Sequence, residues 1–204
     1  MEIVKVEGQV RTEFGKKHNK QLRKQGLVPA IVYGGGTTLA IAVTPKAVKP
    51  LIYTPDFKLA EISAGGESYT CILKDITFHP VSDEIVHIDF LRTIEGNAIK
   101  VEIPVKYKGK SPGVKGGGKL ITQMRKVKVK TMPNLLVDTL YVDISDLELG
   151  NSVRVRDIDA PEGMELMTDG ATPVALVEIP RALKSAAAAE EKEEGAAADA
   201  APAE

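Results

Sequence analysis

Apolar residues alternate with small or polar residues along most of the chain, and this period of two is typical of β-strands. The alternating segments are short and are separated by Gly, Pro and Asp residues, which favours a barrel or a sandwich over strand–helix–strand units. They are Leu39/Ile41/Val43, Tyr69/Cys71/Leu73, Val86/Ile88/Phe90, Val101/Ile103/Val105/Tyr107, Leu140/Val142/Ile144, Val153/Val155 and Val174/Leu176, with Val127/Val129 set between lysines. The pattern predicts a mainly β protein.

Two helices are predicted in the first half of the chain. The segment from Gly15 to Gln25 has no Pro or Gly inside it and ends at Gly26, a residue that commonly terminates helices. The second helix begins at Thr44-Pro45, an N-cap residue followed by proline at the first helical position. Pro50 limits or kinks this helix, because a proline inside a helix removes a hydrogen bond.

The first predicted helix is cationic rather than amphipathic. Lys16, Lys20, Arg23 and Lys24 share one stripe at helical spacing, and Leu22 is the one large apolar residue. Core packing does not explain such a helix. A basic stripe is the footprint expected of a site for a polyanion, and a solvated face that keeps the protein soluble is the alternative.

Charge is segregated along the chain although the formal net charge is only −1. Residues 1–95 carry 12 basic and 11 acidic groups, and residues 96–130 carry 10 basic groups and 1 acidic group. Residues 131–180 carry 2 basic and 10 acidic groups, and residues 181–204 carry 3 and 6. Within the basic block, the glycine- and lysine-rich loop from Lys108 to Lys119 is expected to carry any polyanion contact of the second half.

The hydrophobic pattern changes at Thr93-Ile94-Glu95-Gly96-Asn97, where we predict a domain boundary. Residues 1–94 then form a first domain and residues 95–180 a second, β-rich domain. Residues 181–204 are rich in Ala and Glu and have few large apolar residues, so that they cannot offset the entropy of ordering. We predict a disordered C-terminal tail there.

Several classes of chemistry are unexpected in this chain of 204 residues. Its single cysteine, Cys71, alternates with apolar residues like a buried side chain and can form neither an internal disulfide nor a Cys-rich zinc site. Tyr33-Gly34-Gly35-Gly36 lacks the spacing of a phosphate-binding loop and is interpreted as a hairpin turn. The start lacks a signal-peptide pattern, and no apolar run approaches the roughly 20 residues of a membrane span. We expect a soluble, intracellular protein with no cofactor and no catalytic site.

His87 and Asp89 lie two residues apart on a predicted strand and share its outward face, opposite Val86, Ile88 and Phe90. They could form half of a metal site, but no third ligand follows at convincing spacing. A satisfied polar pair is the simpler interpretation. An imidazole beside a carboxylate on a rigid strand is also suited to contact base edges or riboses.

These residues resemble a known family, the bacterial 5S-rRNA-binding large-subunit ribosomal protein twenty-five. One signature is Arg11…Gly15-Lys16…Leu22-Arg23-Lys24-Gln25-Gly26-Leu27-Val28-Pro29-Ala30-Ile31-Val32-Tyr33-Gly34-Gly35. A second is Leu73-Lys74-Asp75-Ile76, His79-Pro80 and His87-Ile88-Asp89-Phe90-Leu91-Arg92. The second half resembles the extra domain of the longer form, called general stress protein CTC, through Gly109…Pro112-Gly113-Val114-Lys115, Gly117-Gly118, Leu120 and Leu147-Glu148-Leu149-Gly150.

The resemblance implies that residues 1–94 form a small β-barrel with a few helices, similar to the anticodon-binding domain of glutaminyl-tRNA synthetase. It implies binding to 5S rRNA around loop E, partly through the minor groove. The implied RNA-contact residues are Arg11, Lys24, Tyr33, His87 and Asp89, with Lys20 and Arg23 nearby. Together with Lys16 of the cationic stripe they form the predicted RNA-binding site. Asn19-Lys20-Gln21 departs from the serine and two arginines of many members, which removes one cation.

The resemblance further implies a structural protein of the large ribosomal subunit, located on cytoplasmic ribosomes. Its partners would be 5S rRNA, with 23S rRNA and neighbouring ribosomal proteins as further candidates, and neither a membrane nor DNA. One alternative is a stress-related RNA- or tRNA-binding factor that meets ribosomes only transiently. Another is a small enzyme that uses His87 and Asp89, which would need a pocket and a third catalytic group.

Overall fold

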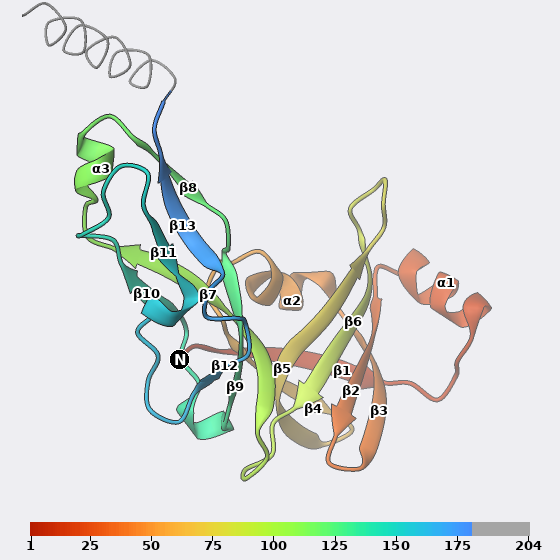
Figure 1. The fold of residues 1–204 in the computed structure, drawn as a ribbon. Coiled ribbons are helices and arrows are strands. Elements are labelled where there is room, and N and C mark those ends of the chain that lie inside the picture. The colour runs from red at the N-terminus through yellow and green to blue at the C-terminus, as the bar shows by residue number, and fades with distance from the viewer. Residues whose placement is uncertain (181–204) are drawn as a thin grey trace, which may run out of the picture. The chain divides into compact units, whose positions relative to one another are not determined.

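The computed structural model of the chain describes residues 1–180 (Figure 1). Strands dominate this part of the chain, which confirms the predicted mainly β fold. The predicted disordered tail, residues 181–204, lies outside the described residues. The described part holds no helix long and apolar enough to cross a membrane.

The first six strands form a closed barrel in the order β1-β3-β2-β6-β5-β4. The barrel closes because β1 pairs in two directions, antiparallel with β3 and parallel with β4. β2 also pairs in parallel with β6, whereas the remaining neighbours are antiparallel. The strands are β1 (Ile3–Val10), β2 (Val28–Gly34), β3 (Thr37–Val43), β4 (Leu59–Ala64), β5 (Glu67–Phe78) and β6 (Ile85–Arg92).

The barrel interior is filled by the inward residues of the alternating segments. Ile41, Ile62, Ile88 and Phe90 are fully buried there. Val86 was predicted to face inward with Ile88 and Phe90, but it is only half-buried. The register of β5 against β6 shifts between Thr77 and Phe78, and this bulge interrupts the alternation at the start of β6.

Both predicted helices form. α1 (Lys16–Lys24) lies outside the barrel, in red in Figure 1. α2 (Pro45–Ile52) begins with Pro45 at its first position and continues two residues past Pro50, so that this proline limits the helix without ending it at once. Val48 and Leu51 are the buried residues of α2, whereas α1 buries none.

The remaining strands form two smaller sheets, one of order β10-β7-β9-β12 and one of order β11-β13-β8. Their strands are β7 (Ile99–Lys108), β8 (Lys119–Thr122), β9 (Lys126–Thr131), β10 (Leu140–Asp143), β11 (Ser152–Arg154), β12 (Glu165–Leu166) and β13 (Pro173–Glu178). The short helical segments are α3 (Pro112–Lys115), η1 (Pro133–Leu135) and η2 (Val155–Asp157). Buried residues Val101, Ile103 and Val105 on β7 and Val127 and Val129 on β9 confirm the predicted alternation there. On β13 the predicted pair Val174/Leu176 is only partly right, because Leu176 is half-buried and its neighbours Ala175 and Val177 are buried.

The chain divides into two compact units that interleave in sequence. The first comprises residues 1–104, 126–140 and 160–167, and therefore includes the whole barrel. The second comprises residues 105–125, 141–159 and the described residues from Thr168 onward. The domain limits proposed from the sequence, 1–94 and 95–180, stay a prediction.

The loop before β8 is fixed by close packing within the second unit. The Ser111 hydroxyl donates a hydrogen bond to the carbonyl of Leu147 and accepts one from the Val114 amide at 3.4 Å. The Gly113 amide also donates to the Leu147 carbonyl, at 3.1 Å. A Cβ on Gly113 would lie 2.6 Å from the carbonyl carbon of Glu148, so only glycine fits this approach.

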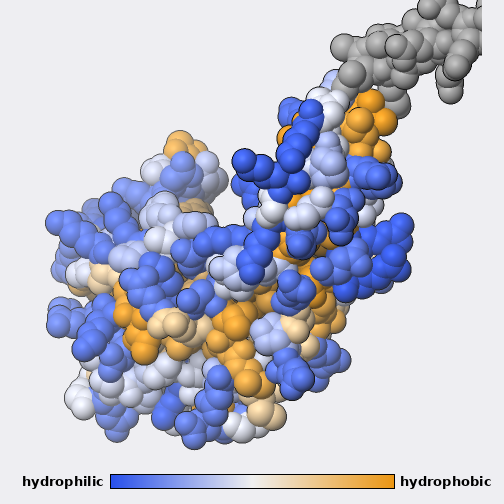
Figure 2. All heavy atoms as spheres, turned by 90° about the vertical axis from the view of Figure 1, so that its left-hand side faces the viewer, coloured by the Kyte–Doolittle hydropathy of each residue, from blue (hydrophilic) through white to orange (hydrophobic). Residues whose placement is uncertain are grey.

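Hydrophilic side chains cover most of the face shown in Figure 2, and apolar side chains appear there as separate patches. Scattered apolar residues of this kind are ordinary on protein surfaces. A functional site on this surface is therefore indicated by the arrangement of polar side chains rather than by apolar ones.

Candidate nucleic-acid interface

Helix α1 ends as its sequence predicts. Gln25 caps it, Gly26 follows with a φ of 77°, and the Leu27 amide returns to the carbonyl of Leu22 at 3.0 Å. The Gly26 amide bonds to the carbonyl of Arg23 at 3.1 Å, which completes a Schellman motif. Arg23 and Lys24 occupy the last turn, where cations interact favourably with the helix dipole.

One contact over a long sequence separation joins α1 to the barrel. The Arg23 guanidinium donates from Nη1 to the carbonyl oxygen of Val86 at 3.3 Å. This hydrogen bond brings the C-terminal turn of the cationic helix beside the start of β6, one residue before His87. Sequence reasoning had placed α1 and β6 in one RNA site only through the resemblance.

The outer face of β6 carries the predicted polar pair. Nδ1 of His87 lies 3.0 Å from Oδ1 of Asp89, and both side chains are about one-third exposed, at 31% and 36%. This contact assigns the proton to Nδ1, so that Nε2 of the neutral ring is free to accept a hydrogen bond. Residues 1–180 hold no cluster of three or more His, Cys, Asp or Glu side chains able to bind a metal.

Tyr33 and Asp75 border this pair on the two neighbouring strands. β2 pairs with β6 so that Ile31 is opposite Asp89, and β5 pairs with β6 so that Asp75 is opposite Asp89. Partial burial and the negative charges of Asp89 and Asp75 raise the pKa of the Tyr33 phenol. Tyr33 therefore remains a neutral hydroxyl donor beside two carboxylates.

Arg11 is tied to the loop that enters α1. Its Nη2 donates to the side-chain oxygen of Asn19 at 2.5 Å and to the carbonyl of Glu13 at 3.3 Å. Its guanidinium carbon also lies 5.9 Å from the ring centroid of Phe14. Arg11, an RNA-contact residue implied by the resemblance, thus also holds this loop against α1.

The predicted site residues fall into three places. Arg23, Tyr33, His87 and Asp89 gather around β6, where Arg23 bonds to the carbonyl of Val86 and Asp89 acts electrostatically on Tyr33. Lys20 and Lys24 line a pocket beside α1 together with Arg23, and Lys16 and Arg11 lie outside that pocket.

Sequence reasoning missed three residues of potential importance. Asp75 lies in a sequence signature, but no pattern predicts a role for it, because only strand pairing brings it near Tyr33. Phe14 and Tyr53 are 66% and 63% exposed, and neither lies in a periodic pattern that predicts its position. Exposure of isolated aromatic residues has no sequence signal.

Two predictions about excluded chemistry are confirmed. Gly35 and Gly36, with φ values of 69° and 81°, form the two-residue turn between β2 and β3, as expected of a hairpin rather than a phosphate loop. Cys71 is fully buried in the barrel, and burial raises the pKa of its thiol to about 12, which makes it unsuited as a nucleophile.

Comparison with known proteins finds similarity over both halves of the chain. Residues 6–90 match the model of the ribosomal L25p family, and residues 98–181 match that of the C-terminal domain of ribosomal protein TL5. The large ribosomal subunit protein bL25 of Porphyromonas gingivalis is 42% identical over 189 residues, covering 92% of this chain and 98% of the relative. Proteins of the same name from Bacteroides thetaiotaomicron and Cytophaga hutchinsonii are 39% and 37% identical, covering 93% and 94% of this chain and 98% and 100% of theirs.

Proposed function

The chain belongs to the ribosomal L25p family, and from this premise we propose that it binds 5S rRNA around loop E within the large ribosomal subunit. Membership of this family assigns the chain a structural, non-enzymatic role in the large subunit and locates it on the ribosome. The finer proposal concerns which RNA is bound and which side chains bind it. Membership of the family leaves the hypothesis of a small enzyme that uses His87 and Asp89 without support.

The observation that carries the proposal is the His87–Asp89 pair on the outer face of β6, bordered by the Tyr33 hydroxyl. The wide, shallow minor groove of an RNA helix displays 2′-hydroxyls and base edges. Nε2 of His87 and the carboxylate of Asp89 can accept hydrogen bonds from 2′-hydroxyls and from guanine amino groups. Tyr33 supplies a donor in the same place.

The cationic helix supplies the second part of the interface. Lys16, Lys20, Arg23 and Lys24 are all exposed, and the Arg23–Val86 hydrogen bond holds the helix beside the polar pair. Phosphate contacts from such side chains fix the register on RNA, and base-edge contacts give the specificity. Arg11 would add a phosphate contact at the entrance to the helix.

The test is equilibrium binding of the full chain to 5S rRNA at several salt concentrations, with tRNA as a structured competitor. We expect preferential binding to 5S rRNA and a steep decrease of affinity with salt, because several lysines and arginines displace counterions. Equal affinity for both RNAs would contradict the proposal. Recovery of the chain from large subunits after a moderate salt wash separates a stable subunit protein from a transient stress factor.

A further inference from the structure

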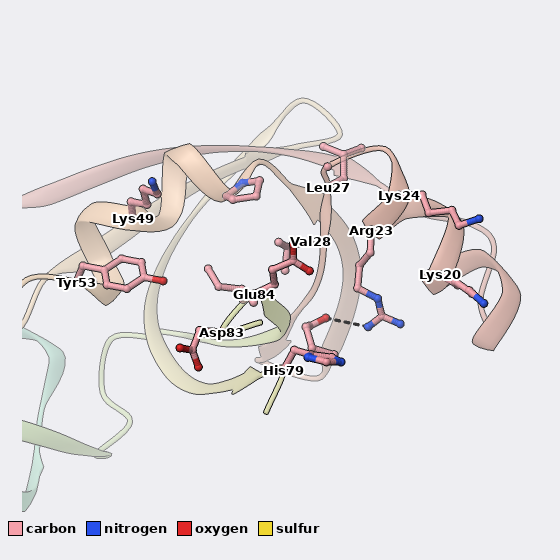
Figure 3. A pocket seen from close by; sticks show the side chains of 14 residues that line it. Lys20, Arg23, Lys24, Leu27, Val28, Lys49, Tyr53, His79, Asp83 and Glu84 are labelled. Atoms are coloured by element: carbon pink, nitrogen blue, oxygen red, sulfur yellow. Dashed lines mark hydrogen bonds between the residues drawn. The ribbon is translucent and has the colours of Figure 1, made fainter. Parts of the chain in front are cut away.

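A pocket of about 740 Å³ lies beside the proposed 5S rRNA interface, within the barrel unit (Figure 3). α1 forms one wall and α2 the other, and the loop between β5 and β6 closes a third side. Leu27, Val28 and Ile85 give it an apolar base. Its volume falls in the range of pockets that hold small ligands.

Cations line the pocket from both helices. Arg23 and Lys24 come from α1 and Lys49 from α2, and the Arg23–Val86 hydrogen bond crosses this region. Figure 3 shows Arg23 extending toward the pocket and Lys24 at its outer edge. The same helix therefore faces the proposed interface and the pocket.

Two carboxylates line the loop side. Asp83 and Glu84 are exposed, and no ion pair joins either of them to a pocket lysine or to Arg23 among the described residues. The loop that carries them is ordered by two backbone hydrogen bonds, from His79 to the Glu84 carbonyl at 2.8 Å and from Asp83 to the His79 carbonyl at 3.1 Å. Asp83 has a φ of 53°, a conformation that aspartate tolerates.

His79 and Tyr53 add a directed donor and a flat surface. Nδ1 of His79 accepts from the amides of Val81 at 3.4 Å and Ser82 at 3.3 Å, so that the proton of the neutral ring lies on Nε2. Tyr53 follows the end of α2 and is 63% exposed, and its ring extends toward the pocket in Figure 3. An exposed ring of this kind is a stacking surface for a nucleobase.

We infer that this pocket receives one unpaired nucleotide of the bound 5S rRNA, with its base on Tyr53 and its phosphate between the cations of α1 and α2. The inference rests on the proposed function. Asp83 or Glu84 accepts from an exocyclic amino group of the base, and Nε2–H of His79 donates to a ring nitrogen or carbonyl. A nucleotide can contact the cations through its phosphate and the carboxylates through its base. An acidic peptide would be repelled by the carboxylates.

The test uses the full chain and 5S rRNA, with affinity measured by fluorescence anisotropy. Tyr53→Leu should weaken binding by roughly 5- to 100-fold, the loss expected for one stacked base, and Tyr53→Phe should bind within about 2-fold of the unchanged chain. Lys49→Gln should lower the salt slope by about one. Lys46→Gln is the matched control, since Lys46 is exposed on the same helix and lies outside the pocket.

Crosslinking with ultraviolet light and mass spectrometry should find a single nucleotide attached to Tyr53. If Tyr53→Leu binds 5S rRNA as tightly as the unchanged chain, the inference is wrong while the proposed function stands. Unchanged 5S rRNA affinity with impaired incorporation into large subunits would assign the pocket to a protein neighbour and would also overturn it. Absence of any 5S rRNA preference in the unchanged chain would instead refute the proposed function.

Discussion

The contact between His87 and Asp89 decides which ring nitrogen would face a bound RNA. Because the carboxylate holds Nδ1–H, the ring presents Nε2, and its orientation is fixed on a rigid strand. Tyr33 contributes a hydroxyl that stays protonated because burial and two nearby carboxylates raise its pKa. The residues that would provide specificity thus lie on strands β2 and β6, and most of those that would provide affinity are cations on α1.

Substitutions in these two groups should have different effects on RNA binding. We expect His87→Ala to weaken 5S rRNA binding by roughly 5- to 100-fold. Tyr33→Phe should also weaken binding, by a smaller factor. Neither substitution should change the salt slope appreciably. Lys16→Ala should lower the salt slope by about one, because it removes one phosphate contact. Titrations at four salt concentrations measure both quantities. If His87→Ala unfolds the barrel, the histidine is structural and this division of roles is wrong.

Burial of Cys71 predicts a pH dependence of stability. Its thiol has a pKa of about 12 in the folded chain, against an ordinary value of 9.0. Between these two values the unfolded chain binds fewer protons than the folded chain, so the free energy of unfolding decreases as pH rises, by up to about 1.4 kcal/mol per pH unit. Below pH 9 the contribution is fully present.

Urea unfolding of the unchanged chain and of Cys71→Ala between pH 8 and pH 10.5 measures this effect. The unchanged chain should lose more stability over that interval than the variant, whatever the cost of the cavity that alanine leaves. Parallel decreases in both proteins would show that the thiol does not contribute.

At the scale of elements, the sequence predicted which segments become strands better than which residues become neighbours. Alternation placed Ile88 and Phe90 inside and His87 and Asp89 outside, and glycine spacing predicted the end of α1 and the β2–β3 turn. The β5–β6 bulge that leaves Val86 half-buried has no signal in a period of two. The approach of Asp75 to Tyr33 and that of α1 to α2 across the pocket depend on strand order, which a pattern does not contain.

The basic block of residues 96–130 spans β7, β9 and the segment between them, and its lysines have different surroundings. On β9, Lys128 lies 3.9 Å from Glu102 and Lys130 lies 3.0 Å from Glu165, so part of this block pairs internally. In the Lys108–Lys119 loop, no ion pair of Lys110, Lys115 or Lys119 is present within the described residues. The loop is therefore the better candidate for contact with RNA.

Acetylation of lysines in the free chain and on large subunits distinguishes these lysines. We expect Lys110, Lys115 and Lys119 to react in the free chain and to be protected on the subunit. Lys128 and Lys130 serve as the internal reference. Equal protection of the loop lysines in both states would mean that they pair within the chain.

The same loop offers a test of its fixed shape. A Cβ at position 113 would lie 2.6 Å and 2.8 Å from backbone atoms of Glu148 and Leu149, which cannot move without shifting that segment. Gly113→Ala should therefore destabilise the fold by about 1–3 kcal/mol. Gly116→Ala is the matched control, because its Cβ would approach no closer than 3.4 Å to the tip of Leu149. Thermal unfolding measures both, and equal melting temperatures would contradict the packing argument.

At the scale of the whole molecule, the two signatures of the first half and all eight predicted 5S rRNA-binding residues lie within residues 1–94. We propose that this segment is the complete 5S rRNA-binding part, because all six barrel strands and both of its helices fall within it. A fragment of residues 1–94 should bind 5S rRNA with a steep salt dependence. A fragment with a cooperative melting transition but no preference for 5S rRNA would show that the second half is required.

The barrel is closed by its N-terminal strand, and this order has consequences during translation. Ile3 pairs with Leu59 and Gly8 with Val43, so β1 is synthesised before either of its partner strands. Such non-local pairing is slow, and one edge of β1 stays unpaired in the nascent chain until β4 has been made. If β1 is deleted, β3 and β4 become free edges that can pair with strands of other chains. Loss of these few residues should therefore cause aggregation of newly made protein rather than a small decrease in RNA affinity.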